Sequence, residues 1–142
     1  MINLALIKRL LRAGGIATLV LCVLATTALT WFGQNYAGYD LSATLTRIFF
    51  WGLVTLVCAA PICLVVFPLM HLVLGGGAPV RPRTFAFTGA GLGFALAVYL
   101  IWRFRAFLLQ ASFLPALMLV LIGTLTGLIG GFVYEWLARE RV

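Results

Sequence analysis

Charged side chains are scarce in this chain of 142 residues, which holds ten Lys and Arg and only three Asp and Glu. Charged residues make up 9% of the sequence and hydrophobic residues 64%, whereas a water-soluble domain is about a quarter charged. This composition excludes the soluble globular classes. It also leaves few side chains for acid–base chemistry, so the sequence predicts more about membrane placement and helix packing than about activity.

Residues that bind metals or form covalent intermediates are equally rare. The sequence has one histidine, and its three cysteines, at positions 22, 58 and 63, form no C-x-x-C pair. It also lacks H-E-x-x-H, G-x-x-x-x-G-K and any Ser/His/Asp arrangement, the patterns typical of metalloproteases, phosphate-binding loops and hydrolases. We therefore expect no enzyme activity, no metal and no cofactor.

Four uncharged runs separate the charged residues. They lie between Arg12 and Asp40, between Arg47 and Arg81, between Arg83 and Arg103, and between Arg105 and Glu135. Their lengths are 27, 33, 19 and 29 residues, and a helix needs about 20 apolar residues to cross a bilayer. The sequence thus predicts an all-α membrane protein, a four-transmembrane-helix bundle forming one domain over residues 1–142. We expect its helices at about 13–32, 46–74, 84–102 and 113–136.

Lys and Arg are unequally divided between the two predicted sides of the membrane. Seven lie on the side of the two termini and three on the other side. Because cytoplasmic segments are enriched in basic residues, we expect both termini in the cytoplasm. The net charge of +7 then reflects contact with anionic lipid rather than with nucleic acid. Nine of the ten basic residues are arginine, which indicates a GC-rich bacterial genome. Together with the four predicted spans, this predicts a multi-pass protein of the bacterial inner (cell) membrane.

Small residues recur every four positions in the last two predicted helices. The third helix reads Gly89-x-x-x-Gly93-x-x-x-Ala97, and the fourth reads Gly123-x-x-x-Gly127-x-x-x-Gly131. Small residues at this spacing form a groove in which two helix backbones approach closely. We expect the two stripes to pack the third helix closely against the fourth; the alternative is that one stripe binds another subunit.

Four arginines flank the third predicted helix. Arg81 and Arg83 precede it among prolines, and Arg103 and Arg105 follow it. The second pair lies on the side that the positive-inside rule makes poor in basic residues. We expect all four to contact lipid headgroups. For Arg103 and Arg105, an acidic partner or an anionic substrate is the alternative.

His71 and Glu135 are the candidates for a polar site near the membrane boundary. A carboxylate inside lipid suggests proton or cation coupling. However, Glu135 precedes Arg139 by four residues, the spacing of a helical ion pair. We expect an interfacial ion pair at Glu135 and an interfacial hydrogen bond at His71, with proton coupling and ligand binding as the respective alternatives.

Pro61 and Pro68 interrupt the second predicted helix. Each proline lacks a backbone N–H and frees a carbonyl one turn earlier, so the helix should kink. Broken helices build substrate sites in transporters, although no charged residue lies between Arg47 and Arg81. We expect a kink, with a substrate path as the alternative.

One short segment resembles a known family. The run Arg9-Leu-Leu-Arg-Ala-Gly-Gly-Ile-Ala-Thr is similar to the opening of small four-helix proteins linked to moving polyprenyl-bound sugars. The similarity covers these ten residues, and the rest of the chain departs from that pattern. The resemblance implies a four-helix membrane fold and a lipid-linked substrate.

The lack of site chemistry indicates a non-catalytic function. We predict an accessory or structural subunit of a larger inner-membrane complex, with membrane lipids and other membrane subunits as partners. The alternative is a small oligomeric transporter or channel for lipid-linked or small anionic substrates. In that case the chain forms homo-oligomers, and the kinked second helix lines the path.

Overall fold

The computed structural model describes residues 4–37, 40–74, 83–104 and 113–139, without the side chains of 33–37. The described part is helical and contains no strand. Its elements are α1 (Leu4–Ala37), α2 (Leu41–Pro61), the π-helix η1 (Ile62–Val66), α3 (Phe67–Leu74), α4 (Arg83–Arg103) and α6 (Leu114–Arg139). Four helical stretches are long and apolar enough to cross a membrane: Leu4–Phe32, Leu41–Leu74, Arg83–Arg103 and Leu114–Arg139. The prediction of an all-helical chain with four apolar spans is confirmed.

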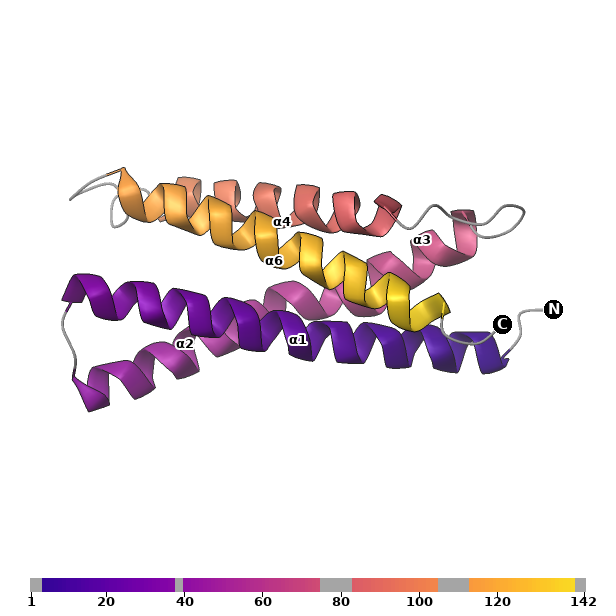
Figure 1. The fold of residues 1–142 in the computed structure, drawn as a ribbon, viewed down its shortest axis with the longest axis horizontal. Coiled ribbons are helices and arrows are strands. Elements are labelled where there is room, and N and C mark those ends of the chain that lie inside the picture. The colour runs from indigo at the N-terminus through magenta and orange to yellow at the C-terminus, as the bar shows by residue number, and fades with distance from the viewer. Residues whose placement is uncertain (1–3, 38–39, 75–82, 105–112, 140–142) are drawn as a thin grey trace.

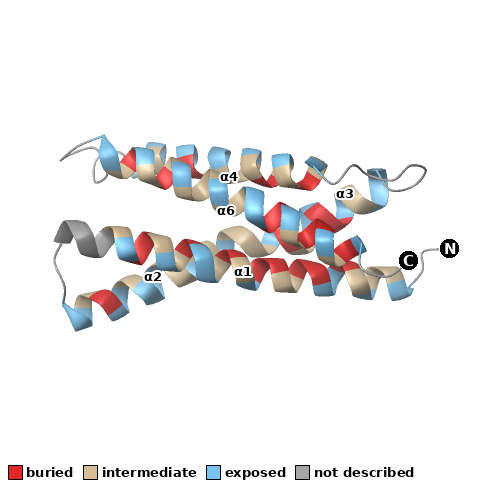
Figure 2. Cartoon of the chain, in the orientation of Figure 1, coloured by how far each residue is buried: buried red, intermediate tan, exposed pale blue. Residues whose placement is uncertain are grey.

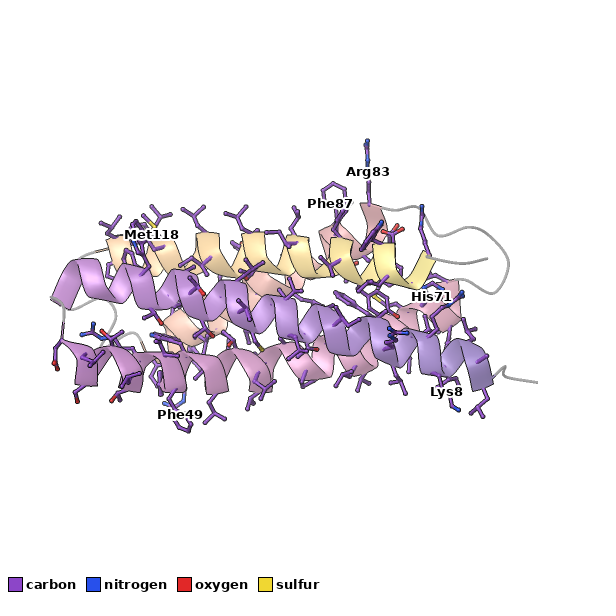
Figure 3. The ribbon with its side chains drawn as sticks, turned by 60° about the horizontal axis from the view of Figure 1, so that its bottom comes forward. Lys8, Phe49, His71, Arg83, Phe87 and Met118 are labelled. Carbon is purple, nitrogen blue, oxygen red and sulfur yellow. The ribbon has the colours of Figure 1, made fainter. Side chains whose placement is uncertain are left out.

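The first two helices begin earlier than the sequence predicts. α1 begins at Leu4 rather than near residue 13, because its basic first turns are amphipathic: Leu10 is buried in the core while Lys8 points away from the bundle (Figure 3). α2 begins at Leu41 rather than near residue 46, and Asp40 caps it by accepting the N–H of Ala43 at 3.2 Å. Both helices therefore continue beyond the uncharged run. They can do so because charged side chains on a helix can reach the polar headgroups while the backbone stays helical.

The second span contains a π-helical turn between its two prolines. In η1 the N–H of Phe67 donates to the carbonyl of Ile62, five residues earlier. Pro68 has no N–H to continue an α-helical register at the next position, which favours the wider turn here. The carbonyl of Cys63 lies directly against Gly14 of α1, where no Cβ would fit. The sequence predicts a kink in this helix, and a π-helical turn lies at that place.

The chain is arranged as two helical hairpins (Figure 1). α1 pairs with α2, η1 and α3, and α4 pairs with α6 through the largest contact in the molecule. α1 also packs along α6 and thereby joins the hairpins, whereas α2 and α4 barely touch. The end where α1 begins and α6 ends is called the terminal end below. The end where α2 begins and α4 ends is called the opposite end.

Buried residues are concentrated toward the terminal end (Figure 2). A large core cluster there contains Leu10, Ala13, Ala17, Leu21, Cys63, Phe67, Phe85, Tyr134 and Ala138. A smaller cluster near the opposite end contains only Leu29, Ala97 and Leu119, with Trp51 and Leu100 packed against it. The bundle is therefore tightly closed at one end and thinly packed at the other.

Candidate functional site

The small-residue stripes of α4 and α6 face each other. A Cβ placed on Gly89 would overlap the carbonyl of Gly127, and one placed on Gly93 would overlap the carbonyl of Gly123. A Cβ on Gly123 would lie 3.1 Å from the Cβ of Ala97, which is buried. These contacts join backbone to backbone, the arrangement that small residues at four-residue spacing allow in lipid.

The third small residue of α6 extends the same contact toward the terminal end. A Cβ on Gly131 would overlap the carbonyl of Phe85 at the start of α4. The two stripes thus pack against each other within the chain. A different glycine of α4, Gly91, faces open space, with no atom within 4 Å of the place its Cβ would take.

An aromatic cluster closes the terminal end between α3, α4 and α6. The ring of Phe67 lies 5.8 Å from that of Phe85 and 5.2 Å from that of Tyr134, and Phe85 lies 5.3 Å from Tyr134. His71 stacks on the outer side of this cluster, 5.9 Å from Phe85 at an interplanar angle of 26°. Such edge and tilted pairs stabilise the contact beyond the area they bury. His71 therefore contributes to helix packing.

Glu135 forms the ion pair that its spacing predicts. Its Oε1 lies 2.8 Å from Nη2 of Arg139, one turn along α6. The Glu135 side chain is 5% exposed and that of Arg139 is 48% exposed, so the carboxylate is buried in the bundle and the guanidinium reaches the surface. The sequence predicts the ion pair but does not predict that the carboxylate is buried behind Arg139. The carboxylate is buried because Gly131, one turn earlier, brings this face of α6 against α4.

A lateral cleft opens where α2 and α4 fail to meet, and it forms a cavity of about 100 Å³. α2 and η1 line one wall with Trp51, Val54, Thr55, Cys58, Ala59 and Ile62. α4 lines the other wall with Gly89, Gly93, Leu96, Ala97 and Leu100. α1 and α6 form the floor, and Phe67 of the aromatic cluster lies at the terminal end. The cleft is half open to the surroundings of the bundle.

The two threonine hydroxyls that line the cleft form hydrogen bonds within their own helices. The hydroxyl of Thr55 donates to the carbonyl of Trp51 at 2.8 Å and lies 3.3 Å from the hydroxyl of Thr26 on α1. The hydroxyl of Thr126 donates to the carbonyl of Ile122 at 2.6 Å. Because hydroxyls that are bonded to their own backbone offer little to a ligand, the cleft presents an almost wholly apolar surface.

Two of the four predicted arginines are described, and they lie at opposite ends of α4. Arg83 is exposed at the terminal end and points away from the bundle (Figure 3). Arg103 is exposed at the opposite end, three residues after the cleft residue Leu100. Arg81 and Arg105 lie outside the described residues. The structure therefore separates Arg83 from Arg103. Arg83 lies at the end of the bundle where His71 stacks on Phe85, and Arg103 lies at the other end.

Sequence reasoning missed both the cleft and the aromatic cluster that closes it. Trp51 is half-buried in the cleft wall, whereas Trp31, Trp102 and Trp136 are exposed. A usable signal was the run Trp51, Val54, Cys58 and Ile62, which keeps one face of α2 apolar at helical spacing. Nothing in that run tells a lipid-facing stripe from a cleft wall.

The described residues bring together no group of three or more His, Cys, Asp or Glu side chains that could hold a metal ion. Compared with protein-family models, with curated proteins and with solved structures, the chain matches none. The functional argument therefore depends on the geometry of the chain itself, above all on the lateral cleft.

Proposed function

We propose that this chain is a non-catalytic membrane protein that binds the apolar chain of an amphiphile in the lateral cleft. This is the binding step that the predicted transporter of lipid-linked substrates requires. The observation that carries the proposal is the separation of α2 from α4, which leaves an apolar cleft open on the side of a bundle built for lipid. Because an empty cleft would forfeit van der Waals contacts along its lining, a hydrocarbon chain stabilises it.

The length of the cleft favours a lipid chain over the helix of a partner protein. Eleven positions separate Trp51 from Ile62 on one wall and Gly89 from Leu100 on the other. At a rise of about 1.5 Å per residue each wall is about 16 Å long. This is about half of the ~30 Å hydrocarbon core. A transmembrane helix of a partner would need a groove of the full thickness, whereas the chain of a lipid in one leaflet needs half of it.

Filling the cleft tests the proposal. Leu96 lines the cleft, whereas Val98, two residues later on α4, is exposed on the outside of the bundle. We expect Leu96→Trp to lower the fraction of purified protein that carries a bound lipid several-fold, because the indole takes the place of the chain. Val98→Trp adds the same side chain outside the cleft and should leave that fraction unchanged. The measurement is native mass spectrometry of the protein released from mild detergent.

Equal lipid occupancy in the wild-type chain and in both variants would contradict binding in the cleft. Val54→Trp on the opposite wall serves as a second filling variant, so that misfolding of one variant does not decide the result. Circular dichroism of each variant shows whether the helices are retained.

An accessory role in a larger membrane complex is the second candidate function. The observation that favours it is the open space at Gly91, with exposed Phe87 and Phe94 on the same helix. A small residue between large ones lets a second backbone approach closely. Affinity purification in mild detergent separates the candidates: stoichiometric recovery of unrelated membrane chains supports the accessory role, and recovery of this chain with lipid alone counts against it.

A further inference from the structure

The two ends of the lateral cleft differ in packing: the large core lies at one end, and only the small cluster lies at the other, which is called the thinly packed end below. At the terminal end Phe67 lies in the lining, and its ring is held in the cluster with Phe85 and Tyr134. At the opposite end the lining stops at Trp51 and Leu100, where only the small cluster around Leu29 lies beneath. A hydrocarbon tail can therefore point toward Phe67, and the polar head of the same molecule must lie at the opposite end.

Both walls of the cleft end in an arginine at the opposite end. Arg47 precedes Trp51 by four residues and Val54 by seven, so it lies on the face of α2 that forms the wall. Arg103 follows Leu100 by three residues and Leu96 by seven, so it continues the wall formed by α4. Arg47 is half-buried and Arg103 is exposed. The thinly packed end of the cleft is thus flanked by two cationic side chains at the depth where headgroups begin.

One acidic residue, Asp40, lies at the same end of α2. Asp40 precedes Arg47 by seven residues, which places it about 10 Å farther from the cleft along α2. Its carboxylate accepts the N–H of Ala43 as the cap of α2. Along α2 and α4, the charged positions nearest to the thinly packed end of the cleft are therefore those of Arg47 and Arg103.

We propose that the cleft binds an anionic phospholipid of the leaflet at the opposite end, with one acyl chain in the cleft and the phosphate at Arg103 and Arg47. The proposal rests on the proposed function and adds to it the direction of the chain and the charge of the head. An arginine at the headgroup level favours an anionic lipid over a zwitterionic one by about fivefold. Arg83 and the basic first turns of α1 lie at the terminal end and flank no wall of the cleft at its thinly packed end.

Fluorescence of Trp51 reports on the lipid in the cleft. Trp31, Trp102 and Trp136 are exposed, and replacing them with Phe leaves Trp51 as the single indole of the full chain. The protein is reconstituted in phosphatidylcholine vesicles that contain a minor fraction of phosphatidylglycerol or phosphatidylcholine with brominated acyl chains. Bromine quenches an indole that it contacts, so the quenching measures which lipid lies beside Trp51.

We expect brominated phosphatidylglycerol to compete for the site beside Trp51 about fivefold more strongly than brominated phosphatidylcholine. Arg103→Gln should bring this ratio toward one. Arg83→Gln removes the same charge from the other end of the same helix and should leave the ratio unchanged. A second reference protein carries its single Trp at position 49, where the native Phe49 is 75% exposed and points outward (Figure 3); there both lipids should quench equally.

The outcomes separate the two proposals. Equal quenching of Trp51 by the two lipids, at a level like that at position 49, would overturn the selection of an anionic head and leave chain binding in place. Quenching of Trp51 by neither lipid, with normal quenching at position 49, would overturn both proposals. A preference for phosphatidylglycerol that survives Arg103→Gln and Arg47→Gln would overturn the role of the arginines.

Discussion

Gly89 and Gly91 lie two residues apart on α4 and meet opposite surroundings. Gly89 is buried against the carbonyl of Gly127, whereas Gly91 faces open space. The same residue type therefore has two different physical roles on one helix. At Gly89 the missing side chain allows backbone contact between helices, and at Gly91 it leaves only the ordinary cost of glycine in a helix.

Adding one methyl group at each position isolates the helix contact. Both substitutions to Ala gain the same helix propensity, about 1 kcal/mol relative to Gly. We expect Gly91→Ala to be neutral or stabilising. We expect Gly89→Ala to destabilise the bundle by about 1–3 kcal/mol, because its Cβ would overlap a backbone carbonyl and α4 would have to move. The measurement is the free energy of unfolding in mixed detergent micelles, and equal effects of the two substitutions would contradict the role of Gly89 in close packing.

Glu135 and Arg139 show which features of a pair of side chains can be predicted from the sequence. Their spacing of four predicts the ion pair, and the pair is present at 2.8 Å. The glycine stripe also predicts which face of α6 meets α4, and Glu135 follows Gly131 on that stripe by four residues. The depth to which its carboxylate is buried could not be predicted, because it depends on how closely the two helices approach at this end. That approach is set by Gly131 against Phe85, a contact between residues far apart in the chain.

At the scale of elements, the π-helix η1 joins two parts of one span, α2 and α3, that have different structural roles. α3 carries Phe67 and His71 into the aromatic cluster, while α2 forms a wall of the cleft. One residue in a π-turn is an extra residue relative to an α-helix, and it turns the following segment by about 100°. η1 therefore sets which face of α2 lies in the cleft when α3 is held in the cluster.

Restoring a donor at position 68 tests this role. Pro68→Ala supplies a backbone N–H, which allows α-helical hydrogen bonding to continue through η1. We therefore expect α2 to rotate relative to α3, and this rotation should move Cys58 out of the cleft. The measurement is the labelling rate of Cys58 by a membrane-soluble maleimide, in a chain whose Cys22 and Cys63 are replaced by Ala. We expect the rate to change several-fold.

Pro115 provides the matched control for that experiment. It lies in the first turn of α6, where a backbone N–H has no partner within the helix. Pro115→Ala should leave the labelling of Cys58 unchanged. An unchanged rate in both variants would show that Pro68 does not set the register of the second span.

The spans themselves were predictable because charge and lipid are incompatible. Each uncharged run is long enough for one membrane-spanning helix, and each of the four spans contains a large part of one run. The sequence predicts that α1 and α2 begin later in the chain than they do. A helix can begin outside the lipid where one of its faces packs against the core, as Leu10 of α1 does. The cleft was not predictable, since it arises where α2 and α4 are not in contact, and no local pattern encodes that separation.

At the scale of the whole molecule, two hairpins meet closely at one end and diverge at the other. The aromatic cluster and the large core join them at the terminal end, and the cleft separates them toward the opposite end (Figures 1 and 2). This gives the bundle a direction across the membrane. Whether the lipid in the cleft comes from the outer or the cytoplasmic leaflet then depends on how the chain is oriented in the membrane.

The distribution of basic residues predicts that orientation. α1 begins and α6 ends at the same end of the bundle (Figure 1), and seven of the ten Lys and Arg lie on that side of the spans. Because basic segments are retained in the cytoplasm, we expect the terminal end to be cytoplasmic and the cleft to open to the outer leaflet. A reporter enzyme that is active only outside the cytoplasm, fused after Val142, should be inactive, and a fluorescent protein at the same position should be bright.

Neutralising the basic first turns of α1 tests the cause. Lys8→Gln with Arg9→Gln and Arg12→Gln lowers the count on the terminal side from seven to four, against three on the other. We expect the outside-active reporter to gain activity in part of the population, because the difference that holds the chain in one orientation is then nearly lost. Full activity of that reporter in the unaltered chain would place the terminal end outside, and the cleft would then take its lipid from the cytoplasmic leaflet.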